Sequence, residues 1–193
     1  MTITKNLSAL DRLNRKIFEH EETFDMSNWV DAERGVNQML LDGDVDTVKL
    51  GECGTTACAA GHAINDFVGP VEIRRNERSM FGPTPEIFID GMPSDDFFYR
   101  EVREHADFYR EYYQDTAGMA LDCSFTDSFP AIEFAEVGAR VLGLTYPEAE
   151  TVFYTGKERA KHLISGFISI AYWEQAVRHR KTEAEKFGEW TAE

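Results

Sequence analysis

Chemically reactive side chains are concentrated in one short segment of this 193-residue sequence, Cys53-Gly-Thr-Thr-Ala-Cys-Ala-Ala-Gly-His62. Cys58 and His62 are four residues apart, so in a helix they would share one face and could hold a zinc ion together. Cys53 and Cys123 would complete a tetrahedral set of three cysteines and one histidine. Structural zinc sites usually repeat a pair of closely spaced cysteines, however, and this chain contains only one such pair. The spacing therefore disfavours zinc at this segment.

A cysteine nucleophile is the second chemistry that the segment allows. A thiol in the first turn of a helix lies near the positive end of the helix dipole, which lowers its pKa, and either Cys53 or Cys58 could occupy that position. The base would have to be one of four histidines, His62, His105, His162 and His179. No cysteine and histidine spacing in the chain matches a protease signature, so we assign no catalytic residue.

Close packing explains the same segment more simply. Five of the seven residues from 57 to 63 are alanine or glycine, and a free cysteine behaves as a small buried apolar residue. We expect Gly61 to mark the contact with a neighbouring backbone or aromatic ring, and His62 to be a buried histidine bonded to the backbone. On this interpretation the segment binds no metal and no cofactor.

The elements that must position these residues are mostly helices. Capping residues and apolar spacing predict helices over residues 8–20, 26–41, 57–67, 95–115, 128–142, 146–154 and 157–186. Gly143 is expected to end the fifth of these helices, and Thr145 with Glu148 to form a capping box at the start of the sixth. Two short strands, 71–75 and 86–90, flank a connection with glycine and two prolines, which indicates a small antiparallel hairpin. The predicted fold class is mainly α: a single compact helical domain, residues 1–193, of six to seven helices with that hairpin.

Three patterns along the chain resemble one group of proteins. They are Phe24-Asp-Met-x-x-Trp29, Cys53-Gly-Thr-x-x-Cys58-x-Ala-Gly-His62-Ala, and Ala139-x-x-Leu142-Gly-Leu-Thr145 followed by Glu148-Ala149. In these patterns the chain is similar to a group of small, mostly uncharacterised proteins of bacteriophages and bacterial genomes. The resemblance implies a phage or bacterial origin. It assigns no activity, ligand or catalytic residue.

The composition of the chain indicates the cellular compartment of the protein. No run of about 18 apolar residues occurs, and the first eleven residues contain no apolar stretch of the kind found in secretory signals. Three cysteines make an odd number, whereas a secreted disulfide framework favours an even one. We therefore expect a cytoplasmic protein, in a bacterium or in the host of a phage.

The stretch from Ala139 to Ala149 has the spacing of a helix-turn-helix. A DNA-binding hairpin needs a second helix that faces phosphates, but residues 146–154 contain Glu148 and Glu150 and no lysine or arginine. The net charge of −15 also repels a phosphate backbone. We expect a helical hairpin inside the core and no direct contact with nucleic acid.

Negative charge is concentrated between Glu86 and Glu136, where thirteen carboxylates face only three arginines. We interpret residues 86–136 as an acidic, aromatic-rich, insertion-like block. The helix expected over 95–115 has more aromatic residues than one apolar stripe can bury, and aromatic side chains rimmed by carboxylates are typical of a surface for a basic partner. The expected contact residues are Asp95, Asp96, Glu101, Glu104, Asp107, Tyr109, Glu111, Tyr112, Tyr113 and Asp115. The alternative is a solvated amphipathic helix with ion pairs four residues apart.

Two functions follow from these features. The first is a non-enzymatic interaction or regulatory protein that binds a basic surface of another protein, such as one that holds nucleic acid, and inhibits it. The alternative is a metal-binding or cysteine-dependent enzyme that uses Cys53, Cys58 and His62.

Overall fold

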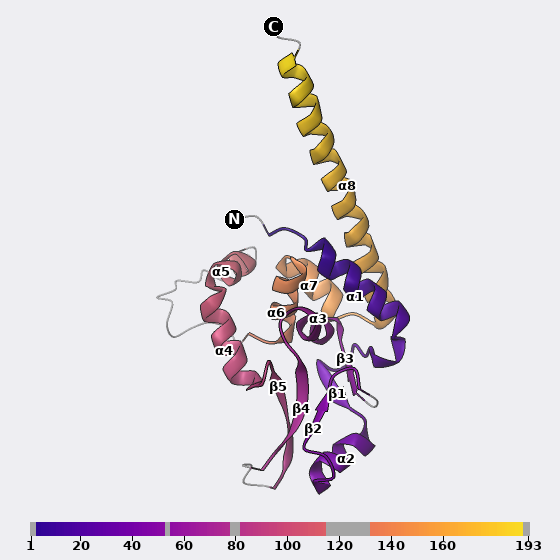
Figure 1. Ribbon diagram of the computed structural model, residues 1–193, viewed down its shortest axis with the longest axis vertical. Coiled ribbons are helices and arrows are strands. Elements are labelled where there is room, and N and C mark those ends of the chain that lie inside the picture. Colours follow the sequence, from indigo (N-terminus) through magenta and orange to yellow (C-terminus); the bar gives the residue numbers. More distant parts are fainter. Residues whose placement is uncertain (1–2, 53–54, 78–81, 115–131, 191–193) are drawn as a thin grey trace.

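The computed structural model describes residues 3–52, 55–77, 82–114 and 132–190, and helices make up most of this part of the chain (Figure 1). The helices are α1 (Leu7–Glu19), α2 (Arg34–Asp42), α3 (Ala59–Phe67), α4 (Ser94–Glu104), α5 (Ala106–Gln114), α6 (Phe134–Leu142), α7 (Tyr146–Phe153), α8 (Lys157–Trp190) and the short 3-10 helix η1 (Glu21–Thr23). The strands are β1 (Val30–Ala32), β2 (Thr47–Lys49), β3 (Thr55–Ala57), β4 (Val71–Asn76), β5 (Thr84–Ile89) and β6 (Met92–Pro93). The mainly helical fold class is confirmed.

The centre of the molecule is α3, which packs against α6 and α1 (Figure 1). Small side chains bring these helices close together. A Cβ atom on Gly138 of α6 would lie 2.8 Å from the Cβ of Ala60, so neither position has room for a larger residue. The apolar core that surrounds this contact draws buried residues from α1, α4, α5, α6, α7 and the first half of α8.

The predicted hairpin is confirmed and belongs to a larger sheet. β4 and β5 pair antiparallel within a four-stranded sheet of order β2-β4-β5-β6. Val71 and Ile73 alternate with polar residues along β4, as expected for a sheet with one covered face. Ile73 joins Leu40 of α2 and Val48 of β2 in a second, smaller apolar cluster, so α2 covers this face of the sheet.

Predicted helix boundaries are wrong at four places. The helix expected over 128–142 begins only at Phe134, and residues 128–131 lie outside the described residues. Residues 30–32 form β1, which pairs with β3, so the helix expected over 26–41 begins only at Arg34. Similarly, α3 begins at Ala59 because Thr55 to Ala57 lie in β3. The helix expected over 95–115 is two helices, α4 and α5, with a break at His105. In the two cases that involve β1 and β3, strand pairing between distant residues overrides a local helical pattern.

The turn between α6 and α7 follows the predicted chemistry. Gly143 ends α6 in the left-handed conformation, with φ +66°, and a Cβ atom there would collide with the backbone carbonyl of Thr4. Thr145 and Glu148 form a capping box at the start of α7. The capping box and the glycine stop expected from the sequence are thus confirmed.

The last helix, α8, extends far beyond the rest of the molecule (Figure 1). Its 34 residues correspond to a rod about 50 Å long. The first half lies along α1, where the Ser165 hydroxyl donates to the Asn14 side chain at 3.0 Å. Within the described residues, no helix combines the length and the apolar character that crossing a membrane requires.

Gly61 offers a direct test of the packing around α3. A Cβ atom at this position would lie 2.3 Å from the backbone oxygen of Trp29 and 2.8 Å from the Cβ of Ala57, which confirms the expected close approach. We expect Gly61→Ala to lower the free energy of unfolding by about 1–3 kcal/mol, because the backbone of β1 must move away.

The matched control is Gly166→Ala in α8, where a Cβ atom meets nothing within 4 Å. This change should stabilise the protein by about 0.5–1 kcal/mol, since alanine is the better helix former. Urea unfolding measures both free energies. Equal effects of the two substitutions would contradict the packing role of Gly61.

Candidate functional site

The Cys58–His62 segment lies inside the core. Cys58 is the N-terminal cap residue of α3 and is 1% exposed, and His62 in the first turns of the same helix is completely buried. The His62 ring stacks on Phe24 with centroids 5.6 Å apart, and its Nε2–H donates to the backbone oxygen of Thr23 at 2.8 Å. His62 is therefore the backbone-bonded core histidine that the packing interpretation predicts.

Burial holds both of these groups in their uncharged forms. Burial raises the pKa of the Cys58 thiol to about 11, although backbone amides of α3 partly oppose the shift. Burial also lowers the pKa of His62 to about 4, against the opposing effect of its hydrogen bond to Thr23. At neutral pH neither a thiolate nor an imidazolium is present, so these two side chains lack the activation that a cysteine nucleophile needs.

Only two of the four candidate zinc ligands, Cys58 and His62, lie within the described residues. Cys53 and Cys123 lie outside the described residues. Within the described part of the chain, no group of three histidine, cysteine, aspartate or glutamate residues is arranged to hold a metal ion.

Several described residues of the acidic block, residues 86–136, lie in the core. The expectation that its tyrosines are exposed is wrong: Tyr109, Tyr112 and Tyr113 of α5 are 0%, 2% and 6% exposed. The Tyr112 and Tyr113 rings pack edge to face on each other, and both pack against Tyr146 of α7. Burial raises the pKa of each of the three hydroxyls far above its ordinary value. These side chains hold α5 on the core and are not available to a partner.

Glu101, another of the expected contact residues, is also buried. It is 3% exposed and forms an ion pair with Arg140 of α6, and the Tyr109 hydroxyl donates to the same carboxylate oxygen at 3.1 Å. His105 Nε2 lies 3.7 Å from the other oxygen. The expectation that Glu101 faces a partner is therefore wrong, because a buried carboxylate requires these internal partners.

The remaining expected residues divide into exposed and half-buried groups. Asp95, Asp96, Glu104 and Asp107 are exposed along the outer side of α4 and the start of α5, whereas Glu111 is half-buried. Asp115 lies outside the described residues. The structure adds Tyr99, which is 69% exposed on the same side. We name Asp95, Asp96, Tyr99, Glu104 and Asp107 the acidic face.

Charge on the acidic face is unevenly balanced. Glu104 lies 4.0 Å from Arg100, and Asp107 lies 2.6 Å from Arg110, so these two carboxylates have cationic neighbours. Within the described residues, neither Asp95 nor Asp96 forms an ion pair. Unbalanced negative charge is thus greatest at the first turn of α4.

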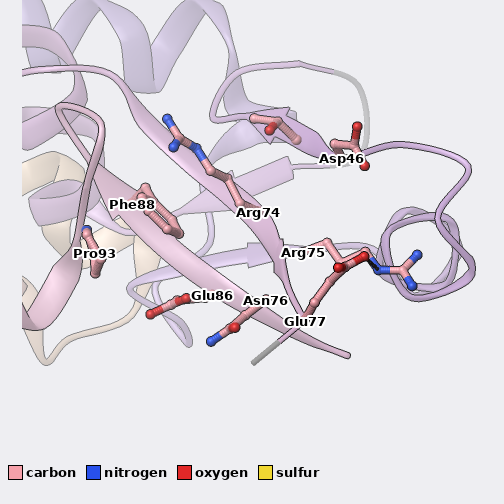
Figure 2. A pocket seen from close by; sticks show the side chains of 9 residues that line it. Asp46, Arg74, Arg75, Asn76, Glu77, Glu86, Phe88 and Pro93 are labelled. Carbon is pink, nitrogen blue, oxygen red and sulfur yellow. Dashed lines mark ion pairs between the residues drawn. The ribbon is translucent and has the colours of Figure 1, made fainter. Parts of the chain in front are cut away.

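A hollow of about 670 Å³ opens on the face of the sheet opposite α2, where Arg74, Glu86 and Phe88 lie (Figure 2). Phe88 forms part of its wall, with the Arg74 guanidinium 4.3 Å from the ring centroid. The lining residues are Asp46, Thr47, Arg74, Arg75, Asn76, Glu77, Glu86, Phe88 and Pro93. Pro93 directly precedes α4, so the hollow and the acidic face are neighbours.

The cations of the hollow already have partners. Two nitrogens of the Arg74 guanidinium donate to the Glu72 carboxylate. Arg75 packs against Gly43 at the C-terminal end of α2, and its guanidinium lies 3.6 Å from the Glu77 carboxylate. Carboxylates outnumber arginines in the lining, so the hollow is better suited to a cation than to an anion. In the sequence, alternation of polar and apolar residues along the predicted strands indicates that the sheet has a polar face. It does not indicate that this face forms a hollow.

The α6–α7 hairpin has the packing role expected of it. Ala149, Val152 and Phe153 of α7 lie in the core, and the exposed side of this helix carries Glu150. This side has the wrong charge for a DNA groove. The absence of direct nucleic-acid contact stays a prediction.

Comparison with protein-family models, with curated proteins and with solved structures returns no match.

Proposed function

We propose that this chain is a non-enzymatic interaction protein that binds a basic surface of a partner protein through the acidic face. The observation that carries the proposal is the first turn of α4, where Asp95 and Asp96 are exposed and unpaired within the described residues beside the exposed ring of Tyr99. An aromatic anchor next to unbalanced carboxylates suits a lysine- or arginine-rich surface.

The way in which α4 is held supports the proposal. The opposite side of the helix is fixed in the core by Phe97, which is fully buried, and by the ion pair of Glu101 with Arg140. The outer side is therefore presented on a rigid element, and little conformational entropy is lost when a partner binds. The adjoining hollow, with Glu86 and Phe88 in its lining, extends the same surface toward the sheet.

A more specific form of the proposal concerns the target and origin. A basic surface that otherwise holds nucleic acid has the charge that the acidic face would attract, and occupation of that surface would inhibit its owner. The motif resemblance to phage and bacterial proteins is in keeping with such a role in the bacterial cytoplasm.

The test compares three immobilised forms of the chain in a bacterial lysate. We expect the wild type to retain a defined protein at low salt, and Asp95→Asn/Asp96→Asn/Tyr99→Ala to lose it. The control Asp42→Asn/Asp44→Asn also removes two negative charges, at exposed positions near the end of α2, and it should still retain that protein. Truncation of an aromatic anchor alone typically costs 2 kcal/mol or more, about 30-fold in affinity.

Salt dependence provides the second arm. Binding of the retained protein should weaken steeply between low ionic strength and about 0.5 M salt, because exposed charges are screened. Retention that is equal in both salts, or equal for the acidic-face variant and the wild type, would overturn the proposal.

A further inference from the structure

The C-terminal part of α8 carries a row of apolar side chains that remain exposed in the described part of the chain. Ile170, Trp173 and Val177 are 55%, 67% and 44% exposed. They lie within an arc of about 60° on one side of the helix, since successive residues are about 100° apart. We name these three residues the α8 seam.

The seam is separate from the side of α8 that packs on the molecule. Ala160 and Ile164 are fully buried against the core, and Phe167 and Ile168 are partly buried against it. That stripe lies about 120° around the helix from the seam. The C-terminal part of α8 extends away from the other described elements (Figure 1), so none of these elements lies over it. Exposed apolar rows of this kind mark interaction sites.

The spacing of the seam indicates the geometry of its occupant. The three residues are separated by three and then four positions, which is the repeat of the contact line in a two-stranded coiled coil. A second helix lying along α8 would therefore cover all three side chains at once. A single pocket or a flat surface would not need this repeat.

The distribution of charge points to a second copy of the same helix. α8 has seven lysines and arginines against five acidic residues, a net charge of +2, so the remainder of the chain carries −17. Residues 169–190 contain four of each sign and are neutral. Two such segments can lie together without net repulsion.

Other occupants fit less well. A basic partner would be drawn to the strongly acidic remainder of the chain, and an acidic partner would be repelled by it. We propose that this chain forms a dimer in which the α8 seams of two copies pack against each other.

The test is the solution mass of the full chain, measured by sedimentation equilibrium as a function of concentration. Wild type should have twice the 22.0 kDa of one chain at about 100 µM and dissociate on dilution. Ile170→Glu/Val177→Glu places carboxylates opposite one another across the dimer axis and should raise the Kd of self-association at least about 10-fold.

The control is Tyr172→Glu. Tyr172 is 54% exposed in the same part of α8 but lies roughly 130° around the helix from the seam, so this variant should dimerise like wild type. A wild type that is monomeric at about 100 µM, a dimer that survives the double substitution, or equal dissociation by Tyr172→Glu would each overturn the inference.

Salt separates this inference from the proposed function. Screening reduces repulsion between the acidic bodies, so the dimer should persist or strengthen in about 0.5 M salt, whereas binding of a basic partner should weaken. A dimer without partner binding, or partner binding by a monomer, would show that one proposal fails and the other stands.

Discussion

Replacement of Arg140 by methionine is expected to lower the free energy of unfolding by about 3 kcal/mol. Arg140 is the cationic partner of Glu101, a carboxylate that is only 3% exposed between α4 and α6. Without the guanidinium, Glu101 keeps the Tyr109 hydroxyl and the more distant His105 ring as its neighbours. Loss of one member of a buried ion pair typically costs 3–5 kcal/mol, and the 21% exposure of Arg140 places the expectation at the lower end.

Two further variants separate loss of the ion pair from loss of packing. Arg110→Met removes an arginine whose ion pair with Asp107 is exposed, and it should cost less than about 0.5 kcal/mol. The double substitution Glu101→Gln/Arg140→Met also removes the buried carboxylate that Arg140→Met leaves without its arginine, so this variant should be more stable than Arg140→Met alone. Urea unfolding gives all three values. If Arg140→Met costs no more than Arg110→Met, then the buried pair does not hold α4 in place.

Acid is expected to destabilise the protein through His62 by about 3 kcal/mol. The pKa of this histidine is about 4 in the folded chain against an ordinary value near 6.5. Between these values the unfolded chain binds more protons than the folded one, so stability falls as pH falls. The loss of stability begins near pH 6.5 and is complete below about pH 4. Its cause is burial, because a buried imidazolium has only the Thr23 carbonyl to solvate its charge.

The measurement is the free energy of unfolding from pH 7 to below pH 4 for wild type and for His62→Gln. Subtraction removes the contribution of the many carboxylates, and the difference should shrink toward low pH by about 3 kcal/mol. His162→Gln, at an exposed position of α8, should leave the pH profile of wild type unchanged. A His62 ring that titrates near pH 6.5 in the folded protein would contradict its placement in the core.

Local sequence signals determined the parts of this fold that depend on neighbours along the chain. The capping box of Thr145 with Glu148 and the left-handed stop at Gly143 require only residues within one turn, so they could be read directly. The β4–β5 hairpin likewise follows from alternating residues around a turn. Small side chains around Gly61 predicted close packing, because a missing Cβ limits what can lie there.

Tertiary structure alone decided which side chains face solvent. The aromatic residues of α5 exceeded one narrow stripe, and local reasoning therefore placed some of them at the surface. Tyr112 and Tyr113 are instead covered by Tyr146 of α7, which is more than thirty residues away in sequence. Glu101 is buried for the same reason, since its partner Arg140 comes from α6.

The Cys53–His62 segment shows the same division. Residue types alone allowed a metal site, a nucleophile or a packing helix, and spacing favoured the last. Only the fold places Cys58 and His62 at the centre of the core, where burial keeps them uncharged. The sequence by itself determined the small, close-packed character of this segment and placed Asp95, Asp96, Glu104 and Asp107 at the surface. Only the tertiary structure decided that Tyr99 and the α8 seam are exposed and that Glu101 is not. The reason is that burial depends on what lies across the core and not on spacing along one helix.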